Sequence, residues 1–343
     1  MRENDFNRLL KVLNREKFSE PVLFEMIICK EILNLLAGYS LPQEPTEKDR
    51  FLYLCAAFAA AGYDYVIFMP NGFGFTHKIK QNGKSISMNS GVLINDWESF
   101  RNYPWPDPGA VDYSILKDAQ ALMPKKVKIL LPVPWGILEN ITSFLGYENL
   151  CMLIYDDPEL VKAVCDAVGE RLLEFYRICL SYDSVGGIIY NDDWGFNSGP
   201  LFAPDFFQTY IFPWVKKMTD ISHQKGKPAI IHSCGKLDIF MDTIIDDLKF
   251  DGKHSFEDKI MPIETAYKMY GSRIALLGGI DVDFMIRASK EDIYSRSRKM
   301  LELGKSGYAL GTGNSVPYYV PKENYFSMIS AAGMSFNYDN YDI

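Results

Sequence analysis

Residues 227–235 read KPAIIHSCG, a short apolar run that ends in a histidine and a cysteine. Continuous apolar runs of this length are typical of parallel strands that are buried on both faces of a sheet. Seven further runs of this kind lie at residues 21–25, 64–68, 126–133, 187–191, 250–254, 273–279 and 307–311, of which 250–254 is short and more polar. Helical patterns separate the runs, among them residues 157–180, 204–223, 289–303 and 321–332.

Eight strand–helix alternations predict an α/β protein with the (β/α)8 TIM-barrel architecture, as a single domain over residues 1–343. An open, doubly wound sheet is the rival, but no G-x-G-x-x-G follows the first strand. The connection 69–112 is long and carries glycine, proline and aromatic residues, with a hairpin expected around residues 81–85. We expect this connection to act as a lid or a pocket wall, and residues 337–343 to form a frayed tail.

The composition limits the partners. The net charge of −8 argues against nucleic acid and anionic membrane surfaces as main partners, because both attract basic patches. No stretch approaches the roughly 18 apolar residues of a membrane span, and residues 1–8 are polar and charged, unlike a signal peptide. The six cysteines are scattered through apolar sequence, which favours reduced thiols in a cytoplasmic protein.

In a barrel of this kind, the active site lies at the carboxyl ends of the strands. His232 and Cys234 end the fifth predicted strand and are two residues apart, so an extended backbone places both side chains on one face. Imidazole nitrogen and thiolate are ligands that zinc prefers. The spacing therefore favours a metal-binding pair. The alternative is a structural histidine beside an ordinary buried thiol.

Carboxylates follow two of the strands. Asp192 and Asp193 are adjacent, so in a strand their side chains point to opposite faces and we expect one of them to face the pocket. Such a carboxylate is a candidate acid, base or metal ligand, and its structural alternative is a cap or a salt bridge. We assign catalytic roles to Asp193 and Glu257. For Glu257 and His254, which follow the sixth predicted strand, the alternative is a structural hydrogen-bond network. Asp281, after two glycines, is expected to cap the next segment.

Other polar and aromatic side chains lie at the same strand ends. The residues expected to bind substrate are Asn71, Trp135, Asp192, Trp194, His254, Thr312 and Asn314. The aromatic residues that could line a pocket for a flat or apolar ligand are Phe73, Phe75, Trp105, Trp135, Trp194, Phe196, Tyr318 and Tyr319. Core packing is the alternative for each of them.

The strand-end segments resemble the uroporphyrinogen decarboxylase superfamily, and within it the corrinoid-dependent methyltransferase branch. The matching stretches are PVPWG at 132–136, LGYEN at 145–149, DDPEL at 156–160, NDDWG at 191–195, GP at 199–200, HSCG at 232–235, DGKHS at 251–255, GGID at 278–281 and GTGN at 311–314. They occur in order over residues 125–335.

The sequence differs from the decarboxylases of this superfamily at two motifs. Those enzymes carry an R-Q-A-G-R segment that grips substrate carboxylates, but the corresponding residues 24–28 contain no arginine. They also carry a histidine in a G-H-G turn, where this chain has Thr312. An octacarboxylate would leave its charges unpaired in such a pocket, which argues against porphyrinogen decarboxylation.

The methyltransferase branch holds zinc with His-x-Cys and a second cysteine in a G-C-G turn. His232 and Cys234 match the first pair, but Thr312 replaces the last cysteine. The resemblance therefore implies a zinc site completed by Asp193, by Glu257, or by substrate and water. A zinc with fewer thiolates is a stronger Lewis acid, which suits polarising an ether oxygen.

Two hypotheses follow from these residues and the resemblance. The first is a zinc-dependent methyltransferase that moves a methyl group from a small donor, such as a methoxylated aromatic, to a corrinoid protein. The corrinoid would come from a partner, because the chain has no D-x-H-x-x-G pattern. The second is a metal-free member of the superfamily, either a decarboxylase of a smaller substrate or a tetrapyrrole-binding protein.

Overall fold

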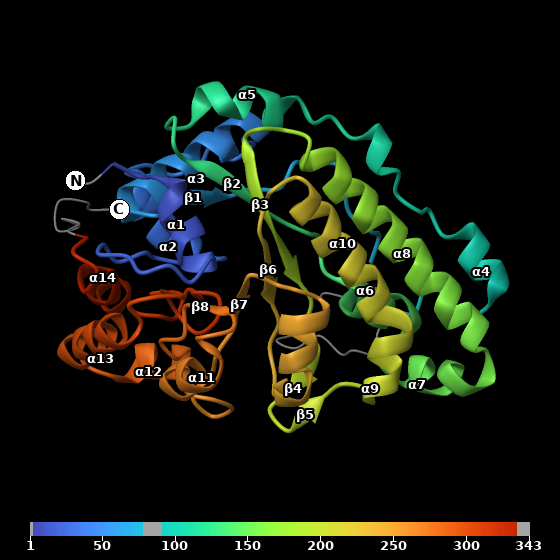
Figure 1. Ribbon diagram of the computed structural model, residues 1–343. Helices are drawn as coiled ribbons and strands as arrows, with labels where there is room; N and C mark the ends of the chain where they lie inside the picture. The colour runs from blue at the N-terminus through green and yellow to red at the C-terminus, as the bar shows by residue number, and fades with distance from the viewer. Residues whose placement is uncertain (1–2, 78–90, 335–343) are drawn as a thin grey trace.

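The computed structural model describes residues 3–77 and 91–334. Its centre is a curled, parallel, seven-stranded sheet whose strands follow one another in chain order (Figure 1). The strands are β1 Tyr65–Ile67, β2 Lys128–Pro132, β3 Val185–Asn191, β6 Ala229–His232, β7 Gly252–His254, β8 Ala275–Leu277 and β9 Tyr308–Ala309. Each lies within a predicted run, except that β3 begins before residue 187.

Helices connect the strands and cover the outside of the sheet (Figure 1). They are α1 Phe6–Leu13, α2 Lys30–Ala37, α3 Glu47–Ala61, α4 Trp97–Asn102, α5 Ser114–Leu122, α6 Ile137–Leu145, α7 Tyr147–Asp156, α8 Pro158–Cys179, α9 Pro204–Phe206, α10 Phe212–Gln224, α11 Ile263–Tyr270, α12 Val282–Arg287, α13 Lys290–Leu303 and α14 Lys322–Ser330. A hairpin of β4 Gly195–Phe196 and β5 Gly199–Pro200 lies outside the main sheet. The four predicted helices are confirmed as α8, α9 with α10, α13 and α14.

Local signals explain where these helices begin. The Asp157 side chain accepts a hydrogen bond from the backbone N–H of Leu160, and Pro158 takes the first helical position of α8. Asp281 accepts from the N–H of Phe284 at the start of α12, so the predicted cap is confirmed. These caps satisfy backbone donors that a helix cannot pair internally.

The first predicted strand, at residues 21–25, differs from the expectation. It makes one parallel bridge to the end of β9, where Phe24 N–H donates to Leu310 and Leu310 N–H donates to Val22. Toward β1, the backbone of Glu25 exchanges hydrogen bonds with the Tyr65 hydroxyl. In a closed barrel, the backbone of β1 would pair with the backbone of Glu25, but here the Tyr65 hydroxyl takes that place. The structure therefore shows seven strands of the predicted eight.

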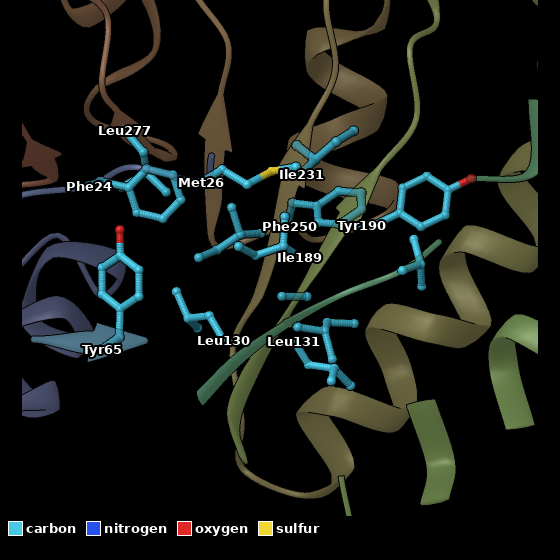
Figure 2. Close-up of a cluster of buried hydrophobic side chains, with 14 of the residues drawn as sticks. Phe24, Met26, Tyr65, Leu130, Leu131, Ile189, Tyr190, Ile231, Phe250 and Leu277 are labelled. Carbon is cyan, nitrogen blue, oxygen red and sulfur yellow. The ribbon is translucent and has the colours of Figure 1, made fainter. Parts of the chain in front are cut away.

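The inside of the curled sheet is apolar. Figure 2 shows buried side chains from several strands in one cluster, including Leu130, Ile189, Ile231 and Leu277. Helix α1 lies against the amino ends of the strands, because Gly186 abuts Phe6 and Gly252 abuts Leu13. With the interior filled by hydrocarbon, polar groups concentrate at the carboxyl ends.

The described part of the connection 69–112, residues 69–77 and 91–112, contains α4, and α4 lies along the outside of α8 (Figure 1). Phe73 is buried and stacks on Phe175 of α8, with ring centroids 4.6 Å apart. Phe73 therefore contributes to core packing. The hairpin expected around residues 81–85 and the tail 337–343 lie outside the described residues.

Within the described ranges, no helix is long and apolar enough to cross a membrane. All six cysteines are free thiols.

Candidate metal centre

Three potential ligands converge at the carboxyl ends of β3 and β6. His232 ends β6, Cys234 follows two residues later, and Asp193 lies just beyond the end of β3. One ligand atom from each lies within 4.8 Å of the other two, and His232 Nε2 is 3.9 Å from Cys234 Sγ. Across residues 3–77 and 91–334, no other three His, Cys, Asp or Glu side chains form such a group. The two side chains of the predicted metal pair thus point toward each other.

A chain of hydrogen bonds orients His232. The Thr312 carbonyl can only accept, so the His254 Nε2 atom 3.2 Å away carries the proton. Burial lowers the pKa of His254 to about 4, so the ring is neutral and its Nδ1 accepts from His232 Nδ1 at 2.7 Å. Burial also holds the pKa of His232 well below its ordinary value. The Nε2 lone pair of neutral His232 therefore faces Cys234, as metal binding requires.

Two donors surround the Cys234 sulfur. Asn314 Nδ2 lies 3.3 Å from Sγ, and the Ser255 hydroxyl lies 3.6 Å from it. The backbone N–H of Cys234 donates to Asp193 Oδ1 at 2.9 Å, which fixes that carboxylate beside the thiol. Burial, together with the charge of Asp193, raises the pKa of Cys234 to about 12. A bound cation would reverse this, because metal coordination deprotonates a thiol.

Thr312 is fully buried and its side chain belongs to a different set of contacts. Its hydroxyl lies 2.7 Å from Glu25 Oε2, and its backbone N–H donates to Glu25 Oε1 at 2.6 Å. Thr312 and His254 are both buried, and the Thr312 carbonyl accepts from His254, which contacts the candidate ligand His232. The sequence suggested that both residues contact substrate, and this role stays a prediction.

Asp192 and Trp194 are also structural. Asp192 is buried, and its carboxylate accepts from the Tyr190 hydroxyl, the Trp194 indole and the backbone N–H groups of Leu138 and Glu139. It therefore anchors the start of α6, and a Cβ on Gly136 would lie 2.2 Å from it. The expectation that adjacent Asp192 and Asp193 face opposite ways holds, with Asp193 facing the cluster. The structure places Trp194 in the core.

A family model described as Uroporphyrinogen decarboxylase (URO-D) matches residues 62–334. The chain belongs to the URO-D family. A relative from Methanosarcina mazei, the methylcobamide:CoM methyltransferase MtbA, is 20% identical over 258 residues, which cover 72% of this chain and 70% of that protein. A solved methyltransferase from Methanosarcina mazei matches with a TM-score of 0.68 and 15% identity, covering 95% of this chain and 97% of that one. The structural likeness supports the URO-D fold.

The remaining site residues predicted from the sequence of this URO-D chain differ in their contacts. Asn314 Nδ2 lies 3.3 Å from the Cys234 sulfur and 3.4 Å from Glu257 Oε1, so Asn314 links Glu257 to the sulfur ligand. Glu257 itself is not one of the three side chains that converge. Trp135, with a positive φ of 65°, packs on His77 at a centroid distance of 4.3 Å. Asn71 is exposed and bonded to Arg50. The Asn71 backbone N–H also donates to Glu47, and the Trp135 carbonyl accepts from Asn140.

The aromatic residues proposed to line a pocket differ in their exposure. Phe73, Phe75 and Trp194 are buried in the core, whereas Phe196, Tyr318 and Tyr319 are exposed. Packing thus accounts for the buried rings.

Sequence reasoning missed two titratable groups of this URO-D site. Lys253 is buried, donates to the Ser255 carbonyl at 2.8 Å and lies over the Phe256 ring; burial lowers its pKa to about 8. Burial and the charges of Asp192 and Asp193 raise the pKa of Glu139 to about 9. For Lys253, the sequence did contain a signal, because a charged residue at position 253 lies inside a strand predicted to be buried.

Lys253 also lines a small cavity, of about 30 Å³, next to this centre. Gly235, Ser255 and Glu257 share its wall. Ser255 has a φ of 85°, which is strained for a residue other than glycine. This conformation turns its carbonyl to Lys253 and its hydroxyl to Cys234.

Proposed function

We propose that this protein is a zinc-dependent methyltransferase that moves a methyl group from a small donor to the corrinoid of a partner protein. The observation that carries the proposal is the convergence of Asp193, His232 and Cys234. The relative whose name describes methylcobamide:CoM methyl transfer supports the reaction class. The proposed donor is a methoxylated aromatic or a similar methyl ether.

The donor set fits zinc. Nitrogen, thiolate and carboxylate ligands at about 2.0–2.3 Å from a tetrahedral ion lie roughly 3.3–3.8 Å from one another. The 3.9 Å between His232 Nε2 and Cys234 Sγ is close to this range. His232, Cys234 and Asp193 would hold the ion, which leaves one position of a four-coordinate site for a substrate atom. When bound, zinc supplies a Lewis acid that polarises an ether oxygen.

The residues of the chain supply orientation and proton handling. His254 holds the His232 ring in the tautomer that exposes Nε2. Asn314 donates toward the Cys234 sulfur and links it to Glu257. We assign to Glu257 the protonation of the leaving oxygen, since Asn314 connects its carboxyl to the sulfur ligand. The exposed Tyr318 and Tyr319 follow β9, on the side where a partner would approach.

We also propose the demethylating direction of transfer. A site with the single thiolate of Cys234 donates less charge into zinc than a site with two, so it favours oxygen polarisation over thiol activation. Free thiols at all six cysteines support our proposal of a cytoplasmic location.

We further propose that residues 21–25 act as the eighth strand of the barrel. Their bridge to β9 supports this. Slow hydrogen exchange at the Phe24 amide, comparable with that of Leu310, is the expected result, and free exchange at Phe24 would contradict it.

Metal content and methyl transfer together test the function. Elemental analysis of the purified protein should give one zinc per chain, and His232→Ala with Cys234→Ser should abolish both zinc and methylation of a corrinoid protein. Cys151→Ser, in α7 outside the site, is the matched thiol control and should retain both. A metal-free protein with full methyl-transfer activity would overturn the proposal.

The second candidate is a metal-free decarboxylase or a tetrapyrrole-binding protein. It is favoured by Thr312, whose hydroxyl is turned to Glu25 at the position where the methyltransferase branch carries its second cysteine. Tetrapyrrole binding or decarboxylation that survives the His232→Ala, Cys234→Ser double substitution would support this candidate.

A further inference from the structure

The contacts of the Thr312 hydroxyl reveal where one buried proton resides. Thr312 Oγ1 lies 2.7 Å from Glu25 Oε2 and 2.5 Å from the Asn314 carbonyl oxygen. A hydroxyl has a single proton, and the Asn314 carbonyl can only accept it. If Glu25 were ionised, one of these two close oxygen pairs would have no hydrogen between its members.

We propose that Glu25 is a neutral carboxylic acid that donates to Thr312 and thereby positions the turn that supports the metal centre. The Glu25 O–H donates to Thr312 Oγ1, which donates to the Asn314 carbonyl, while Glu25 Oε1 accepts from the Thr312 backbone N–H. Every donor in this arrangement then has an acceptor. Glu25 is a positioning residue, since it contacts none of the three candidate ligands in these bonds.

The surroundings of Glu25 favour the neutral form. Its side chain is fully buried, and burial raises its pKa to about 8 against the two hydrogen bonds from Thr312. The titratable groups that face it are the buried phenols of Tyr63, Tyr65, Tyr308 and Tyr325. Among the described residues, no lysine or arginine forms a hydrogen bond or ion pair with Glu25. An ionised carboxylate would therefore be buried without a cation, which is costly.

The turn held by Glu25 leads directly to the ligands. The Thr312 carbonyl accepts a hydrogen bond from His254, which orients His232. Two residues after Thr312, the side chain of Asn314 donates to the Cys234 sulfur. A neutral Glu25 thus keeps the Thr312 hydroxyl away from the metal and leaves coordination to residues 193, 232 and 234. This consequence rests on the proposed zinc site, whereas the protonation of Glu25 does not.

A pH series on Glu25→Gln tests the protonation. Gln has the same shape as the neutral acid: its amide donates to Thr312 Oγ1 and its oxygen accepts from the Thr312 N–H. Because folding raises the pKa of Glu25, its contribution to stability is complete below about pH 4.5 and is lost as pH rises through about 8. The melting temperature of wild type relative to E25Q should therefore fall from pH 5 to pH 9. A difference that is flat, or that rises with pH, would overturn the proposal.

A second measurement reads the proton directly. Difference infrared spectra at pH 7 should contain the carbonyl band of a buried carboxylic acid in wild type and lack that component in E25Q. Both measurements are made with chelator present, so they do not depend on zinc. Identical spectra in this region would show that Glu25 is ionised.

Zinc affinity tests the positioning role. E25Q should retain the wild-type affinity, whereas Glu25→Leu should weaken it at least tenfold because the turn loses its anchor. Should E25L fail to fold, Thr312→Val, which removes the bridging hydroxyl, gives the same comparison. If E25Q and E25L, or E25Q and T312V, bind zinc with equal affinity, Glu25 does not position the site. A chain that binds no zinc but shows the predicted pH series refutes the proposed function while upholding the neutral Glu25.

Discussion

The Nδ1 atoms of His232 and His254 lie 2.7 Å apart, and the far nitrogen of His254 bonds to the Thr312 carbonyl. The two imidazoles therefore form a directed relay in which only His232 has a free lone pair toward the cluster. The register of the sheet creates this pair, because β6 and β7 align His232 with His254.

The relay makes His254 a determinant of metal affinity. His254→Leu removes the acceptor that fixes the His232 tautomer, and such supporting partners are worth about 10–100-fold in affinity. We expect zinc affinity, measured by chelator competition, to fall within that range. The matched control is His223→Gln, which removes a histidine bonded to Asp251. An H254L protein with wild-type affinity would contradict the relay.

The adjacent aspartates should behave oppositely. Asp193→Asn weakens a metal ligand but keeps the oxygen that accepts from Cys234 N–H, so zinc affinity should fall with little change in melting temperature. Asp192→Asn replaces an acceptor by a donor among four existing donors, and should cost about 1–3 kcal/mol of unfolding free energy. Chemical denaturation and zinc titration of both variants provide the comparison. Loss of zinc in D192N alone would reverse the assignment.

Arg296 should stabilise the loop that carries Glu257. Its guanidinium bonds to both oxygens of Asp258 and to Glu264, with the side chain 15% exposed. Arg296→Gln leaves these carboxylates unpaired and should destabilise the protein by on the order of 3 kcal/mol. The exposed pair of Arg177 and Glu174 is the control, because Arg177→Gln should cost under about 0.5 kcal/mol.

The pH dependence of this ion pair has a definite sign. Burial raises the pKa of Glu264, but the hydrogen bonds from Arg296 outweigh it and lower the pKa overall. The contribution of Glu264 is therefore present above its unfolded pKa and is lost as pH falls through the folded one. The gap in melting temperature between wild type and R296Q should narrow in acid. A gap that widens there would contradict this account.

The effect of Lys253 on stability should have the opposite sign from that of Glu25 and should occur at higher pH. Burial lowers its folded pKa to about 8 from 10.5, so the charged form opposes folding below pH 8. Stability should rise with pH between about 8 and 10.5 in wild type, by an order of magnitude of 3 kcal/mol, and this rise should be absent in Lys253→Met. Melting curves of the two proteins over this range measure the difference. Parallel pH profiles would show that Lys253 titrates normally.

Much of the architecture was predictable because its signals are local. Apolar runs marked the strands, and Asp157 with Pro158 marked the start of α8. The convergence of His232 and Cys234 followed from extended backbone, and the opposed directions of Asp192 and Asp193 followed from the same rule. Each inference needed only neighbouring residues.

The missed features depend on contacts between distant segments. Glu25 meets Thr312 across 287 residues, so nothing near either residue in the sequence indicates their pairing. Trp194 reads as a pocket residue beside Asp193, but its ring packs on Phe207 and Phe212. The single bridge of residues 21–25 likewise depends on how the Tyr65 hydroxyl meets Glu25.

The turn at residues 311–313 has a further consequence for redesign. A Cβ on Gly311 would lie 1.8 Å from the Phe24 oxygen, and one on Gly313 would lie 2.0 Å from the Phe256 oxygen. Neighbouring backbone thus leaves no room for a side chain at positions 311 and 313. Of the three residues in this turn, only position 312 can carry different side chains. A redesign of this site should therefore substitute Thr312 and Glu25 together, because their side chains contact each other, and keep the neighbouring glycines unchanged.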